Sequence, residues 1–199
     1  FGIMKAAVRT DLKRLLAYSS IENIGIISLG IGFGLIGKSM GGHFITYIGF
    51  GGALLHMLGH SHYKILLFMG AGSIVNAIHS RDMNRMGGLL KQMPITGVRF
   101  LVGTMAICAV PATMGFTSEF VLMNGLFKSI AANEMIIASI VGIAVLALVG
   151  GLALMTFSKA FGIAFLGNPR SRAAMDAKET NAAMPLGQEL PLVGVLSVP

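Results

Sequence analysis

Charged residues are scarce in this sequence of 199 amino acids, since Asp, Glu, Lys and Arg together make up only 12% of it. A soluble domain is about one quarter charged, so this chain could not cover a water-facing surface with polar groups of its own. Tryptophan is absent, and the one cysteine, Cys108, excludes an internal disulfide and a cysteine-ligated iron–sulfur cluster within the chain. We expect Cys108 to be a small, buried apolar side chain.

Apolar residues are abundant instead and account for 54% of the sequence. A transmembrane helix needs about 20 mainly apolar residues, and four stretches are long enough. We therefore predict an all-α, polytopic transmembrane helix bundle that forms one membrane domain, followed by a polar cytoplasmic loop at residues 168–188. The predicted spans are residues 19–37, 44–78, 100–127 and 135–166.

The distribution of basic residues predicts how the bundle is oriented. The net charge of +7 would suggest nucleic acid as a partner of a soluble protein. Here, however, twelve of the fifteen Lys and Arg residues lie in connectors on one side of the predicted spans, and two lie on the other side. The positive-inside rule places the twelve-residue side in the cytoplasm. We expect a multi-pass protein of the cell inner membrane, in contact with lipid and not with nucleic acid.

Neither end of the sequence has the features of a natural terminus. The chain begins at Phe1 without a Met or a signal-peptide pattern, and it ends a few residues into a further apolar run at 190–198. We therefore expect an internal fragment of a longer membrane protein.

Three basic side chains in the second predicted span give the strongest functional signal. His56, His60 and Lys64 are spaced four residues apart, so a helix places them on one face, each about 6 Å further along the axis than the last. An ionisable group at membrane depth is costly and usually marks an ion pathway. Since imidazole titrates near neutral pH, this ladder predicts a proton relay with Lys64 as its central carrier.

Two other interpretations of this ladder are possible, and one of them remains open. Two histidines four residues apart could bind zinc, but no carboxylate or cysteine completes a tetrahedral set on that face, so we predict no metal site. The same three side chains could also form a structural polar contact between helices.

A second site is predicted in the third span, where Pro111 and Gly115 interrupt the helical pattern. Proline removes a backbone hydrogen bond, and a broken helix is tolerated at membrane depth only beside protein or a water-filled cavity. Glu119 follows about two turns later and is predicted to be a proton-accepting carboxylate, paired with a Lys or His from another span. Alternatively, Glu119 is an interfacial residue or a helix-end partner of Lys128.

Three further features carry weaker signals. Glu22, with its neighbour Asn23, is a possible secondary site of the proton path, but Ser19 and Glu22 also form a capping-box pattern at the start of the first span. Asp11 lies among basic residues and is expected to form a solvated ion pair. The glycines at 30, 32 and 34 lie in an apolar span with no strand before them, which argues against a phosphate-binding loop.

These motifs resemble a known family. The run from Asp11 to Ser20 (DLKRLLAYSS), together with His56-x3-His60-x3-Lys64-ILLFMGAG, is similar to the proton-pumping antiporter-like subunits of complex I and its relatives. Residues 20–25 (SIENIG), 81–94 (RDMNRMGGLLKQMP) and 159–171 (KAFGIAFLGNPRS) resemble the membrane subunits of group 4 hydrogenases, in the hydrogenase-4 and formate hydrogenlyase branch. The motifs match the C-terminal half of such a subunit, so we expect its N-terminal half to lie outside this sequence.

The resemblance implies a subunit that conducts protons. The sequence contains no nucleophile–base pair, cofactor fingerprint or iron–sulfur ligand set, so we expect no cofactor and no bond-making chemistry in this chain. Its implied partners are other membrane subunits and a peripheral redox arm, such as a hydrogenase. In the family, the positions matching His56, His60 and Lys64 lie on a hydrated axis, and a terminal Lys or Glu on a broken helix matches Glu119. Two alternatives stay open: a subunit of a multisubunit sodium/proton antiporter, and a purely structural membrane anchor.

Overall fold

The computed structural model describes residues 1–179, and within this part of the chain the regular elements are all helical. The elements are α1 (Gly2–Ala7), α2 (Leu12–Ser39), α3 (His43–Ile78), the 3-10 helix η1 (Met83–Arg85), α4 (Leu89–Gln92), α5 (Pro94–Ile107), α6 (Met114–Ala131), α7 (Ile136–Phe165) and α8 (Arg172–Met175). One isolated β-bridge joins Asp11 to Asp82. The predicted all-α class is confirmed for these residues.

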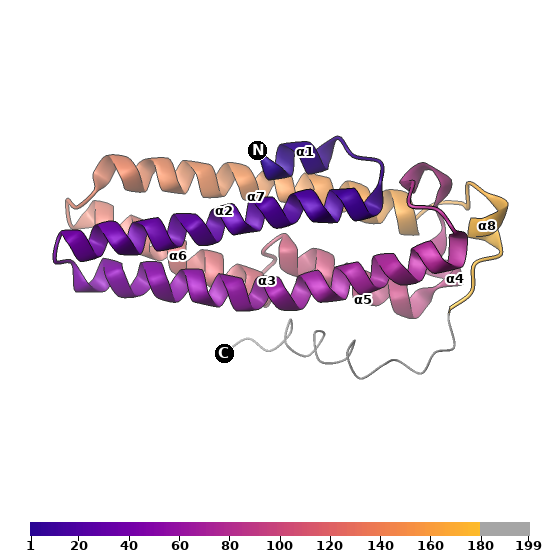
Figure 1. Ribbon diagram of the computed structural model, residues 1–199, viewed down its shortest axis with the longest axis horizontal. Coiled ribbons are helices and arrows are strands. Elements are labelled where there is room, and N and C mark those ends of the chain that lie inside the picture. Colours follow the sequence, from indigo (N-terminus) through magenta and orange to yellow (C-terminus); the bar gives the residue numbers. More distant parts are fainter. Residues whose placement is uncertain (180–199) are drawn as a thin grey trace.

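The long helices lie side by side as an elongated bundle (Figure 1). Tight turns at residues 40–42 and 132–135 connect α2 to α3 and α6 to α7 at one end. The α1–α2 connector, η1, α4 and α8 lie at the opposite end, which therefore carries the basic connectors. Among the described residues, α2 and α7 are long and apolar enough to cross a membrane, and α5 is a shorter apolar helix.

Helix α2 begins seven residues before the first predicted span, and this corrects two expectations. Asp11 is the N-cap of α2, and its carboxylate accepts a hydrogen bond of 2.9 Å from the Arg14 backbone N–H. It therefore acts as a cap, not as a solvated ion pair. Because the helix begins at Leu12, Ser19 and Glu22 lie two to three turns inside it, and the predicted capping box is wrong.

The chain leaves the helical conformation between α5 and α6, at residues 108–113, with Pro111 in the gap. Thr113 caps the second half: its hydroxyl accepts a hydrogen bond from the Phe116 N–H and donates one to the Val110 carbonyl. Gly115 does not lie in the gap but in the first turn of α6, where a Cβ would collide with the Ala106 carbonyl oxygen of α5. Gly115 thus permits the two half-helices to overlap closely.

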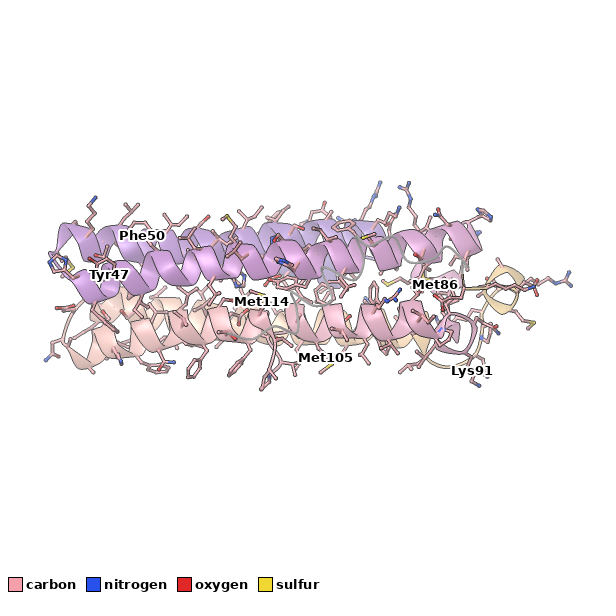
Figure 2. The ribbon with its side chains drawn as sticks, turned by 90° about the horizontal axis from the view of Figure 1, so that it is seen from below. Tyr47, Phe50, Met86, Lys91, Met105 and Met114 are labelled. Atoms are coloured by element: carbon pink, nitrogen blue, oxygen red, sulfur yellow. The ribbon has the colours of Figure 1, made fainter. Side chains whose placement is uncertain are left out.

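The helix break lies beside the middle of α3. A Cβ on Gly59 would lie 3.3 Å from the Cβ of Met114, the first residue of α6. In Figure 2, Met114 is seen near the centre of the bundle, between Tyr47 at one end and Lys91 at the other. The break and the central polar residues of α3 therefore occupy the same level of the bundle.

Two apolar clusters hold the bundle together, one toward each end. The larger contains Leu15, Ile74, Met93 and Phe165 and lies toward the basic connectors, whereas the smaller contains Phe33 and Leu126 among its members. Buried polar side chains lie along α2 and α3 between these clusters. This level is where the candidate site is found.

The segment after α7 packs against the end of the bundle. Ala174 and Ala177 are buried, and the Glu179 carboxylate accepts hydrogen bonds from the backbone N–H groups of Ile95 and Thr96, at 3.0 and 3.1 Å. Residues 168–179 are therefore a docked segment and not only a surface loop. The rest of the predicted loop and the apolar run at 190–198 lie outside the described residues.

Candidate functional site

The Lys64 amine is buried in the middle of the bundle, with 6% of the residue exposed. It donates to the Leu16 carbonyl of α2 at 2.8 Å and to the Ser19 hydroxyl, and it lies 5.9 Å from the centre of the Phe157 ring of α7. These partners are two neutral oxygens and an aromatic face, and none of them is a carboxylate. The groups that contact the amine are therefore neutral, and none of them forms an ion pair with it.

Asn23 of α2 is the centre of a hydrogen-bond network that the sequence does not reveal. Its side-chain nitrogen donates to the Ser19 carbonyl at 2.8 Å and to the Glu22 carboxylate at 3.0 Å. Its side-chain oxygen accepts from the Tyr63 hydroxyl at 2.5 Å and lies 3.1 Å from Nε2 of His56. Asn23 is 1% exposed. Its amide nitrogen and its amide oxygen each have two polar partners, in keeping with the rule that buried polar groups are hydrogen-bonded.

His56 joins three helices. From α3, its Nε2 atom reaches Asn23 on α2, and its Nδ1 atom lies 2.9 Å from the Ser118 hydroxyl on α6. Both His56 and Ser118 are buried, at 1% and 0% exposure. Because Ser118 precedes Glu119, this contact brings the histidine ladder next to the predicted terminal site.

Glu22 is buried inside α2, and the side chain of opposite charge near it within residues 1–179 is Lys64. The two charges interact electrostatically, although the Lys64 amine is bonded to other groups. Glu22 also lines a pocket of about 290 Å³ between α1, α2 and α7, together with Ile21, Leu146 and Val149.

The remaining two histidines of the ladder region differ in role. The His60 ring lies edge-on to Tyr63, with ring centroids 5.6 Å apart, and its Nε2 atom is buried with no hydrogen-bond partner within residues 1–179. His62 points away from the ladder, as the spacing predicts: its Nδ1 atom lies 2.7 Å from the Leu58 carbonyl of its own helix.

Glu119 is half-buried on α6 and faces α7, where a Cβ on Gly150 would lie 3.9 Å from its Oε2 atom. It is not a helix-end partner of Lys128, because the Lys128 amine lies over the Phe44 ring, 5.0 Å from its centre. No direct contact joins Glu119 to Lys64 within the described residues. The structure therefore brings Lys64, His56 and Glu22 into one network through Asn23 and Ser19, and leaves Glu119 one residue beyond it.

Three neutral side chains of this network were not predicted as site residues: Ser19, Tyr63 and Ser118. Each lies close in sequence to an ionisable residue that was, and Tyr63 and Ser118 are direct neighbours of one. The feature of the sequence that could have identified them is a neutral polar residue close to a predicted buried charge. Within residues 1–179, no three His, Cys, Asp or Glu side chains gather in a metal-binding arrangement.

Comparison with known proteins places this geometry in a family. Hydrogenase-4 component B of Escherichia coli (strain K12) is 42% identical over 92% of this chain, and formate hydrogenlyase subunit 3 of the same strain is 40% identical over 88% of it. The chain spans less than a third of the length of these two curated relatives, 28% and 29%.

A solved structure has the same fold. A chain of the membrane-bound sulfane sulfur reductase, an archaeal respiratory membrane complex, superposes with a TM-score of 0.81 over 98% of this chain and 29% of its own length, at 22% identity.

The family model described as NADH:quinone oxidoreductase/Mrp antiporter, TM, matches residues 1–146. The chain therefore belongs to the NADH:quinone oxidoreductase/Mrp antiporter transmembrane family and is an antiporter-like segment of a polytopic membrane bundle.

Proposed function

We propose that this chain conducts protons across the membrane as part of an antiporter-like subunit. The observation that carries the proposal is the buried network that links α2, α3 and α6 at one level of the bundle, together with a lysine amine whose hydrogen-bond partners within residues 1–179 include no carboxylate. A buried ionisable group is expensive, so its usual explanation in a membrane protein is a role in ion transfer.

We assign a role to each ionisable residue predicted for the proton path. Lys64 is the central carrier, His60 and His56 relay protons along α3, and Glu119 is the terminal site beyond the break at Pro111. Glu22 is a secondary site that modulates the charge of Lys64. The four predicted spans then correspond to α2, α3, the α5–α6 pair and α7, with the basic connectors in the cytoplasm and the bundle in the inner membrane.

The proposed setting is a larger assembly. The relatives named above are a component of hydrogenase-4 and a subunit of formate hydrogenlyase, so we propose that this chain works with other membrane subunits and a peripheral redox arm that drives transport. The chain itself contributes no cofactor to that reaction. The family also includes Mrp antiporters, which supports sodium/proton exchange as a second candidate function.

The test is proton flux in membrane vesicles that contain the complete complex with single substitutions. Lys64→Ala removes the central carrier and is expected to abolish flux while the protein still inserts into the membrane. Lys128→Ala is the matched control, because Lys128 is exposed at the far end of α6, and it should leave flux unchanged.

Normal flux in Lys64→Ala would contradict the proposed function. The same vesicles also separate the two transport candidates. Flux that requires sodium on the opposite side of the membrane would favour the antiporter function, whereas flux that depends only on the redox reaction would favour the first.

A further inference from the structure

The orientation of the Asn23 side-chain amide is fixed by its surroundings. One of its two polar atoms lies 2.8 Å from the Ser19 backbone carbonyl, which accepts hydrogen bonds and never donates them. That atom must therefore be the amide nitrogen. The amide oxygen is then the atom that faces Tyr63 and His56, and it accepts the Tyr63 hydroxyl hydrogen.

This orientation determines which nitrogen of the His56 ring carries the hydrogen. The Asn23 oxygen cannot donate, so the contact of 3.1 Å with Nε2 is a hydrogen bond only if Nε2 is protonated. A neutral imidazole has one ring hydrogen, so its Nδ1 atom then presents a lone pair to the Ser118 hydroxyl, 2.9 Å away.

The Ser118 hydroxyl fits both protonation states of His56. It has one hydrogen and two acceptors at 2.9 Å, Nδ1 of His56 and the Gly115 carbonyl. When His56 is neutral, the hydroxyl donates to Nδ1. When a proton binds at Nδ1, the new N–H donates to the hydroxyl oxygen, and the hydroxyl hydrogen turns to the Gly115 carbonyl. No covalent bond of Ser118 breaks, and no buried atom loses its partner.

We propose that Asn23 is a positioning residue that holds neutral His56 in the Nε2–H tautomer, so that an arriving proton binds at Nδ1 and reverses the Ser118 hydrogen bond on α6. This inference rests on the proposed proton-conducting function and adds a direction to it. The proton-accepting atom faces α6 and the helix break, and it faces away from α2. The titratable groups around this bond are Glu22 on α2, His60, Tyr63 and Lys64 on α3, and Glu119 on α6.

The first test is nitrogen NMR of the complete protein, labelled at histidine and kept in lipid nanodiscs, with the His56 signals assigned by their loss in His56→Gln. At a pH where His56 is neutral, the ring hydrogen should be on Nε2, and acidification should protonate Nδ1. Asn23→Asp keeps the accepting oxygen and should keep this tautomer, whereas Asn23→Leu should populate both tautomers. A neutral ring protonated at Nδ1, or an unchanged tautomer in Asn23→Leu, would overturn the inference.

The second test is proton flux in the complete complex. Ser118→Ala removes the partner of Nδ1 and should lower flux at least about ten-fold, the ratio produced by losing roughly 1.4 kcal/mol, and Ser118→Thr should restore it. If Lys64→Ala blocks flux but Ser118→Ala does not, this inference fails and the proposed function stands. If Lys64→Ala leaves flux normal, the proposed function fails, and the NMR result still decides the tautomer.

Discussion

Helices α3 and α7 are the two longest in the described chain, and they serve the bundle in different ways. Helix α7 is long and apolar enough to cross a membrane, whereas α3 does not meet the same criterion of hydropathy. The buried polar residues of α7, Ser139 and Thr156, make no hydrogen bond to another helix within residues 1–179. Those of α3 bond to α2 and α6. The histidines and the lysine of the candidate site therefore lie on a helix outside the group recognised as membrane spans.

The largest effect is expected where the broken helix meets the level of α3. Gly115→Ala places a methyl group against the Ala106 backbone of α5, which cannot move without separating the half-helices. We therefore expect the free energy of unfolding to fall by about 3 kcal/mol, or the bundle to fail to assemble. On α7, Gly151 has open space around its Cβ position, and Gly151→Ala should change stability by less than about 1 kcal/mol. Thermal unfolding followed by circular dichroism in lipid nanodiscs measures both.

Equal unfolding temperatures for these two alanine variants would show that the half-helices do not overlap as described. Both substitutions add the same methyl group to a helix. At position 115 backbone atoms of another helix occupy the space for it, and at position 151 they do not.

A smaller effect is expected from removing one buried hydroxyl. Tyr63→Phe takes the hydrogen-bond donor from Asn23 and leaves the packing of the ring in place, which should cost about 1 kcal/mol of unfolding free energy. Thr156→Val on α7 removes a bond of 2.7 Å to the Leu152 carbonyl of the same helix and should cost less than about 0.5 kcal/mol. If Thr156→Val destabilised the protein more than Tyr63→Phe, the contrast between α3 and α7 would be lost.

The smallest effect is expected at the basic end of the bundle. Glu179 caps the N-terminus of α5, where a negative charge is favourable, and Glu179→Gln should lower stability by about 0.5–1 kcal/mol. Asp176→Asn is the control, since Asp176 is exposed after α8 and caps no other helix. The two variants should leave proton flux unchanged, because Glu179 and Asp176 lie far from the network in the bundle. Loss of flux in Glu179→Gln would contradict this separation.

Much of the helical framework could be predicted from the sequence. The apolar stretch 135–166 corresponds to α7 within one residue at each end, and the stretch 44–78 corresponds to α3. The start of α2 was misplaced because residues 12–18 contain Lys13 and Arg14, which interrupt the apolar pattern without interrupting the helix. The cap that starts the helix, Asp11, resembles a surface charge in sequence.

The network itself could be predicted only in part. His56 and Lys64 stand out because charge in an apolar stretch is costly. Asn23 and Ser118 do not, since a single neutral polar residue is tolerated in many helices and gives no indication of its partner. Their contacts with His56 join positions 33 and 62 residues apart in the chain, and only the packing of α2 and α6 against α3 brings them together.

In the proposed function, the polar middle of α3 and the carboxylate beyond it carry protons and do more than hold helices together. The most direct measurement is proton flux through the complete complex with Lys64→Ala and Glu119→Gln combined, normalised to the amount of protein in the membrane. We expect no flux above that of vesicles lacking the complex. Flux equal to that of the unaltered protein would show that these residues only anchor the bundle.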